Sequence, residues 1–168
     1  KHLKHEASIE QQADCLLQVL SINKSKEKVA ILGRSYGAPI AAAMTVKRPE
    51  KFKELWMVSP VIDPALERFY WFSGIVRPRI VRHLLPRELK MAVAEKEAHI
   101  EHLQQIAYIW DKITTPTTVI TGGKDWVADP KNLVFAKKHI VNTHVQFISL
   151  PSAGHMITFS HKNLIKSM

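Results

Sequence analysis

The residues with the clearest chemical potential form the pentapeptide Gly33-Arg34-Ser35-Tyr36-Gly37. An apolar run precedes it and small apolar residues follow it, which predicts a strand before the pentapeptide and a helix after it. In this context Gly-x-Ser-x-Gly forms a tight turn that exposes the serine hydroxyl and directs the first amides of the helix toward it. We expect a side chain at either glycine to clash in such a turn. The pattern therefore predicts Ser35 as a nucleophile and the backbone N–H of Tyr36 as an oxyanion donor.

A serine nucleophile needs a general base, and one of the nine histidines is well placed for that role. His155 follows the strand-like run 145–150 through a short loop, and an apolar segment comes after it. The sequence thus places it at the carboxyl end of a strand, where the active sites of parallel sheets collect. A purely structural role for His155 is the alternative. The remaining histidines fit polar segments or the solvated faces of helices.

Three aspartates compete for the role of the acid that orients the base. Asp125 follows the β-branched run 117–121 through Gly-Gly-Lys, at the carboxyl end of a predicted strand. Asp63 and Asp129 each precede a proline and a helical pattern, which is typical of a residue that caps a helix. Asp125 has no such explanation, so we predict it as the acid and keep Asp63 in reserve.

The order Ser35, Asp125, His155 along the chain is that of α/β-hydrolases. With the elbow at 33–37, the acid turn at 122–125 and the Gly154-His155 pair, the sequence resembles the carboxyl-terminal two thirds of a capped, esterase- or lipase-like member of that superfamily. The resemblance implies a parallel sheet with helices on both faces. It also implies hydrolysis of a small-molecule acyl substrate through an acyl-enzyme.

The alternation of expected elements agrees with an α/β fold. Strands are expected at 29–32, 53–59, 117–121 and 145–150, and helices at 37–47, 130–140 and from about 156. We predict a hydrolase core at 1–62 and 111–168, interrupted by a helical cap at 63–110. The resemblance implies that such a cap lies over the active site. Residues predicted to line the substrate pocket are Arg34, Phe69, Tyr70, Trp71 and Trp126.

The segment before the elbow strand is short for this superfamily. Residues 1–28 contain one amphipathic helix, which begins at Ser8 with Gln11 completing a capping box. The resemblance implies further strands here, with a loop that supplies the second oxyanion donor, and nothing before Val29 matches them. We therefore expect a fragment of a longer fold. The edge strand Val29–Leu32 would then be covered by the missing N-terminal strands or by another chain.

Composition sets the remaining limits. The chain has 168 residues and a net charge of +9, and its 46% hydrophobic and 23% charged residues are typical of one globular domain. No spacing suggests a metal site, a dinucleotide or a P-loop, so no cofactor is expected. Basic residues cluster at 77–90, where they solvate the cap, steer an anionic substrate or face an anionic membrane. Nucleic acid is not expected, because aromatic residues do not alternate with the basic ones.

The predicted function is that of a serine hydrolase acting on a carboxylic ester, thioester or similar acyl bond. Serine at the elbow argues against the branches that use aspartate there, the epoxide hydrolases and haloalkane dehalogenases. An acyltransferase, a carbon–carbon hydrolase and a non-catalytic ligand-binding protein on the same fold are the alternatives. The single cysteine, Cys15, is expected on the buried side of the first helix.

Overall fold

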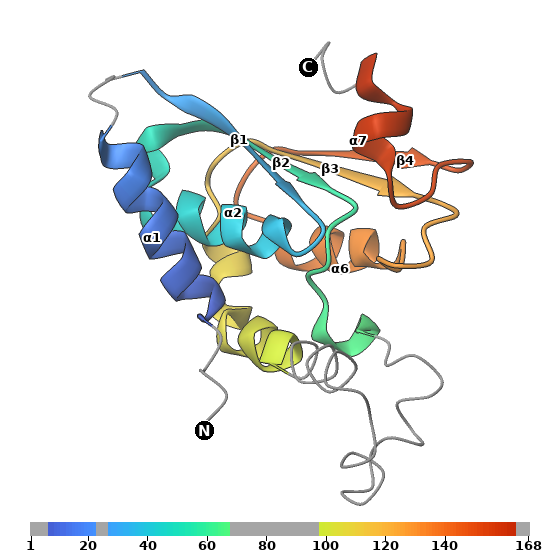
Figure 1. The fold of residues 1–168 in the computed structure, drawn as a ribbon, viewed down its shortest axis with the longest axis horizontal. Coiled ribbons are helices and arrows are strands. Elements are labelled where there is room, and N and C mark those ends of the chain that lie inside the picture. The colour runs from blue at the N-terminus through green and yellow to red at the C-terminus, as the bar shows by residue number, and fades with distance from the viewer. Residues whose placement is uncertain (1–6, 23–26, 68–97, 164–168) are drawn as a thin grey trace, which may run out of the picture.

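The computed structural model describes residues 7–22, 27–67 and 98–163 (Figure 1). Each strand and helix expected there is present, with ends shifted by a few residues at most. The predicted pocket residues Phe69, Tyr70 and Trp71 and the basic cluster at 77–90 lie outside the described residues. The described elements are α1 (Ile9–Ile22), β1 (Val29–Arg34), α2 (Gly37–Lys47), η1 (Pro49–Lys51), β2 (Phe52–Val58), η2 (Pro64–Leu66), helical residues 98–105, η3 (Ala107–Lys112), β3 (Thr117–Gly122), α6 (Asn132–His139), β4 (Val145–Leu150) and α7 (Ile157–Ser160).

The four strands form one parallel sheet in the order β1-β2-β3-β4. Their register aligns Arg34 with Val58 and Gly122 with Leu150, so the carboxyl ends of the strands meet at one edge. The loops after β1, β3 and β4 carry Ser35, Asp125 and His155. The parallel topology therefore brings three segments that are distant in sequence to the same edge.

Helices cover both faces of the sheet, as expected (Figure 1). The larger core cluster joins α1, α2, η3 and α6 to one face, and Leu55, Met57 and Val119 are among its buried residues. The smaller cluster packs Ile157 of α7 against Val58 and the opposite face. Both clusters share β2 and β3, which are the two central strands.

Helix α1 is anchored at its start and along one side. Ser8 and Gln11 form the predicted capping box, with reciprocal bonds of 2.9 and 3.2 Å between side chain and backbone N–H. Tyr108 of η3 donates a hydrogen bond to the Glu10 carboxylate, and this bond raises the pKa of Tyr108. The expectation for Cys15 was wrong, because Cys15 is exposed. None of the described helices is long and apolar enough to cross a membrane.

The last residues of the predicted cap, within 98–110, pack against the core. Leu103, Ile106, Ile109 and Trp110 are each at most 2% exposed and belong to the larger core cluster. Periodic apolar residues of helix 98–105 and η3 thus face α1, α2 and α6 rather than solvent. The boundary between core and cap at residue 110 stays a prediction.

Candidate active site

Ser35 lies at the turn from β1 into α2 in a strained backbone conformation. Its φ is 51°, in the left-handed region that non-glycine residues rarely adopt. The N–H of Ser35 donates to the carbonyl of Val58 at 3.0 Å, and its own carbonyl accepts from Ala38 N–H at 3.0 Å. These bonds tie the turn to β2 on one side and to α2 on the other, and so they hold the strained residue in place.

The two glycines of the elbow differ in what they do. A Cβ on Gly33 would lie 2.4 Å from the carbonyl oxygen of Gly37, so no side chain fits there without moving backbone. A Cβ on Gly37 would meet no atom within 4 Å. The expected clash is therefore real at Gly33 and was wrong for Gly37. Only Gly33 is needed for the close approach of α2 to the end of β1.

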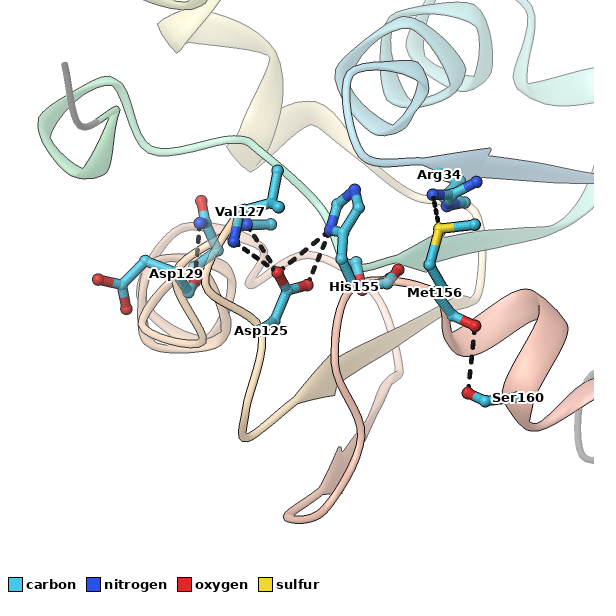
Figure 2. A network of polar contacts seen from close by, with 10 residues as sticks. Arg34, Asp125, Val127, Asp129, His155, Met156 and Ser160 are labelled. Atoms are coloured by element: carbon cyan, nitrogen blue, oxygen red, sulfur yellow. Dashed lines mark hydrogen bonds and ion pairs between the residues drawn. The ribbon is translucent and has the colours of Figure 1, made fainter. Parts of the chain in front are cut away.

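Asp125 and His155 lie side by side at the carboxyl edge of the sheet (Figure 2). Nδ1 of His155 is 2.9 Å from Oδ2 and 3.2 Å from Oδ1 of Asp125. The aspartate side chain is 1% exposed and the histidine side chain 14% exposed. A carboxylate at Nδ1 favours the tautomer that carries its proton there, which leaves Nε2 as the basic nitrogen.

The carboxylate of Asp125 is itself fixed by backbone donors. Oδ1 accepts hydrogen bonds from the N–H groups of Val127 and Ala128, both at 2.9 Å (Figure 2). The prediction that Asp125 has no capping role was wrong, because its side chain caps the turn that follows it. The two bonds fix the orientation of the carboxylate, so that Oδ2 faces the imidazole.

Two glycines allow the loops that carry Asp125 and His155 to run against each other. A Cβ on Gly122 would lie 2.5 Å from the carbonyl oxygen of Ala153, and one on Gly123 would lie 2.6 Å from that of Pro151. Backbone bonds then join the loops, with Lys124 N–H donating to the Ala153 carbonyl at 2.9 Å. The Gly-Gly pair of the acid turn thus has a steric cause that the sequence alone did not reveal.

The reserve acid Asp63 is engaged as a cap. Its Oδ1 accepts from Ala65 N–H at 2.9 Å at the start of η2. The proline directly after Asp63 predicted this capping role. Asp63 also borders a cavity of about 570 Å³ between η2 and α6, whose lining includes none of Ser35, Asp125 and His155. Asp129 likewise accepts from Lys131 N–H at 3.0 Å before α6.

Sequence reasoning missed one buried polar residue that holds the loop after β2. Asn132 is 1% exposed, and its Oδ1 accepts from the N–H groups of Ile62 and Asp63, both at 2.9 Å. A single asparagine at the start of a helix gives no signal of contacts 70 residues away along the chain. The side chain nevertheless ties the loop after β2 to the start of α6.

The other predicted site residues occupy different surroundings. The Tyr36 hydroxyl accepts from Gln12 Nε2 of α1 at 2.8 Å, and its ring lies 4.5 Å from that of His99. Arg34 turns toward α7, where it contacts Met156 (Figure 2). Trp126 is 78% exposed beside Asp125. The assignment of Arg34 and Trp126 to a substrate pocket, and of the Tyr36 N–H as an oxyanion donor, stays a prediction.

The described residues suit acid–base and nucleophilic chemistry. Three loops at the carboxyl ends of the strands carry a hydroxyl on a strained turn, an imidazole and an oriented carboxylate. In residues 7–22, 27–67 and 98–163, no three His, Cys, Asp or Glu side chains are grouped so that they could hold a metal ion.

Comparison with known protein families finds a match to the prolyl oligopeptidase family, which extends over residues 4–167. The chain belongs to the prolyl oligopeptidase family. The match includes the described core and the elbow, acid and histidine loops. The chain is therefore an α/β-hydrolase, in agreement with the resemblance seen in the sequence.

Solved structures support the fold of this prolyl oligopeptidase family member. An α/β-hydrolase enzyme from the metagenome of lagoon sediments at Mar Chica, Morocco, is 24% identical with a TM-score of 0.65, over 98% of this chain and 68% of that one. A monoacylglycerol lipase of Paleococcus ferrophilus is 13% identical with a TM-score of 0.62, over 95% and 74%. The thioesterase domain from the curacin biosynthetic pathway is 17% identical with a TM-score of 0.62, over 99% and 74%. A comparison with curated proteins finds no match.

Proposed function

We propose that this protein hydrolyses an ester-like acyl bond through an acyl-enzyme, with Ser35 as nucleophile, His155 as general base and Asp125 as the acid that orients it. The observation that carries the proposal is the Asp125–His155 pair at 2.9 Å, on the sheet edge that also carries the strained Ser35 turn. A structural histidine needs neither a fully buried carboxylate partner nor a serine elbow nearby.

In the first half of the reaction, Ser35 Oγ attacks the carbonyl carbon of the substrate. His155 Nε2 takes the hydroxyl proton as the new C–O bond forms, and Asp125 stabilises the resulting imidazolium. Negative charge develops on the carbonyl oxygen, and the Tyr36 N–H at the start of α2 donates to it. The tetrahedral intermediate then collapses, and the leaving group departs with the proton from His155.

In the second half, water replaces the leaving group. His155 Nε2 takes a proton from the water as its oxygen attacks the acyl carbon. The bond between the acyl carbon and Ser35 Oγ breaks, and the serine recovers its proton from His155. An acceptor other than water at this step would give acyl transfer, which is the alternative outcome within the same mechanism.

The substrate class is proposed from two sources. The lipase and thioesterase among the structural neighbours support an ester or thioester. The family to which the chain belongs supports a peptide bond as the second candidate. Both reactions use the same nucleophile and base. They differ in the leaving group, because the amine of a peptide must be protonated before it departs, whereas an alkoxide of low basicity departs without protonation.

Steady-state kinetics on matched substrates tests the proposal. p-Nitrophenyl esters of increasing acyl length are compared with prolyl and non-prolyl p-nitroanilides. We expect turnover of the esters, and replacing Ser35 by alanine should lower kcat by about 10⁶-fold. The control is Ser152→Ala, because Ser152 is an exposed serine on the loop before His155.

Two results would contradict the proposal. Turnover of anilides but not esters would make the protein a peptidase. Saturable binding of an ester without turnover in the wild-type chain would favour a ligand-binding protein on a hydrolase fold.

A further inference from the structure

The cationic head of Arg34 rests on two neutral side chains of the segment that follows His155. Nη2 of Arg34 lies 3.0 Å from Sδ of Met156 (Figure 2). The guanidinium carbon of Arg34 lies 5.8 Å from the ring centroid of Phe159. Arg34 directly precedes Ser35, and Met156 directly follows His155. One side chain therefore links the nucleophile turn to the segment of the base, which lies 122 residues away in sequence.

Stability alone does not explain this placement. Among the described residues no carboxylate pairs with Arg34, and its Nε is buried without a hydrogen-bond partner. A thioether is a weak acceptor, and a buried polar atom without a partner costs free energy. A planar guanidinium nevertheless fits flat against a sulfur and an aromatic ring, and an ammonium group does so less well.

The segment that Arg34 contacts has few other restraints. Helix α7 has only four residues, and Met156 and Phe159 are 50% and 67% exposed. Before His155 the loop is held by the bond from Lys124 N–H to the Ala153 carbonyl. At His155 itself, the backbone carbonyl accepts a long hydrogen bond of 3.5 Å from the Ser59 hydroxyl. After His155 the buried Ile157 and the contacts of Arg34 hold the chain in place.

We propose that Arg34 is a positioning residue, which fixes His155 relative to Ser35 by holding Met156 and Phe159 against the nucleophile turn. The inference rests on the function proposed above. Proton transfer from Ser35 to Nε2 requires hydrogen-bond distance in the reacting complex, and the Asp125 bond fixes only the other side of the ring. A drift of about 1 Å in this geometry is enough to slow the reaction.

The test compares Arg34→Met with Arg48→Met in the 168-residue chain. Methionine retains the stem of Arg34 and removes the cation. The Arg48 side chain is 61% exposed, and among the described residues its ion pair is a 3.7 Å surface contact with Glu50. Replacing Arg48 by methionine removes the same positive charge as replacing Arg34. For a neutral ester we expect R34M to lower kcat about tenfold with little change in KM, and R48M to change neither. Arg34→Lys should recover part of the loss.

A double-mutant cycle separates positioning from general weakening of the fold. Met156→Ala should lower kcat to a similar extent, and R34M combined with M156A should be no slower than either single variant. Multiplied losses would overturn the proposal. A raised KM for acidic esters, with kcat for neutral esters intact, would also overturn it and make Arg34 an anion subsite.

The labelling rate of Ser35 by a fluorophosphonate separates this inference from the proposed function. Slower labelling in R34M than in the wild type supports the positioning role. Equal labelling rates in R34M and the wild type would contradict the positioning role of Arg34 but not the proposed function. If the wild type is not labelled, the proposed function is contradicted. The positioning role of Arg34 then falls with it, because that role requires His155 to act as a general base.

Discussion

At the scale of single residues, the two oxygens of Asp125 differ in their contacts. Oδ1 accepts from two backbone N–H groups and lies 3.2 Å from His155 Nδ1, whereas Oδ2 makes the shorter contact of 2.9 Å to that nitrogen. An aspartate that only capped the turn would need the first set, and a catalytic acid needs both. The sequence placed Asp125 at the correct loop, but the backbone donors that orient it depend on a turn whose geometry no spacing rule reveals.

Asparagine substitution distinguishes the acid from its reserve. Asp125→Asn preserves the acceptor for the backbone but presents a neutral amide to His155, so we expect kcat to fall about 10⁴-fold. Asp63→Asn should retain both activity and stability, since asparagine caps as well as aspartate does. Ester kinetics together with thermal unfolding of both variants provides the check. A larger loss in D63N than in D125N would move the acid to Asp63.

The elbow glycines form a second matched pair. Gly33→Ala places a Cβ 2.4 Å from backbone oxygen, so the free energy of unfolding should fall by about 2–3 kcal/mol. Gly37→Ala meets no atom within 4 Å in a helical position, so the free energy of unfolding should stay equal or rise by up to about 1 kcal/mol. Urea denaturation measures both changes. A G37A variant as unstable as G33A would contradict the steric account of the elbow.

At the scale of elements, α1 reaches the nucleophile turn through a side chain. Gln12 donates from Nε2 to the Tyr36 hydroxyl at 2.8 Å and to the Ala7 carbonyl at 2.7 Å. The Tyr36 ring also lies against His99 of helix 98–105. The residue that supplies the proposed oxyanion amide is therefore anchored by two helices that carry no catalytic group.

Removing the Tyr36 hydroxyl separates its side chain from its backbone. We expect Tyr36→Phe to lower the free energy of unfolding by about 1 kcal/mol, because the bond to Gln12 is lost. The backbone N–H is unchanged, so kcat should change by less than about threefold. Denaturant unfolding and ester kinetics measure the two effects. A large loss of kcat without loss of stability would give the hydroxyl a role in the reaction.

The elements themselves were predictable from periodicity, while several contacts between them were not. The strands and α2 follow from apolar runs and turn residues, and the capping box of α1 from the Ser8–Gln11 spacing. The exposure of Cys15 and the link from Gln12 to Tyr36 depend on how α1 rotates against α2. Periodicity defines which face of a helix is apolar, but only packing decides which flank of that face is covered.

At the scale of the whole molecule, the described sheet ends in two edge strands, β1 and β4, and β1 carries an exposed apolar side chain. Within the described residues β1 pairs only with β2, and Leu32 is 45% exposed on the strand face away from α2. An open edge with apolar side chains promotes pairing with further polypeptide. We propose that additional strands or another chain cover the edge formed by β1.

A charge on the open strand tests the proposal for the sheet edge. We expect the 168-residue chain to self-associate with rising concentration, and Leu32→Lys to reduce this without altering the secondary structure. Val141→Lys is the control, because Val141 is 61% exposed outside the sheet. Light scattering over a concentration series measures association. Equal association of the L32K and V141K variants would exclude β1 as the adhesive surface.

Covalent labelling is the most direct test of whether Ser35 is a nucleophile that His155 activates. The wild-type chain, Ser35→Ala, His155→Ala and the control His161→Ala are treated with a fluorophosphonate, and mass spectrometry locates the adduct. We expect a single adduct on Ser35 that is absent in S35A, forms much more slowly in H155A and forms at the wild-type rate in H161A. An adduct on another residue, or equal labelling rates in H155A and the wild type, would contradict this expectation.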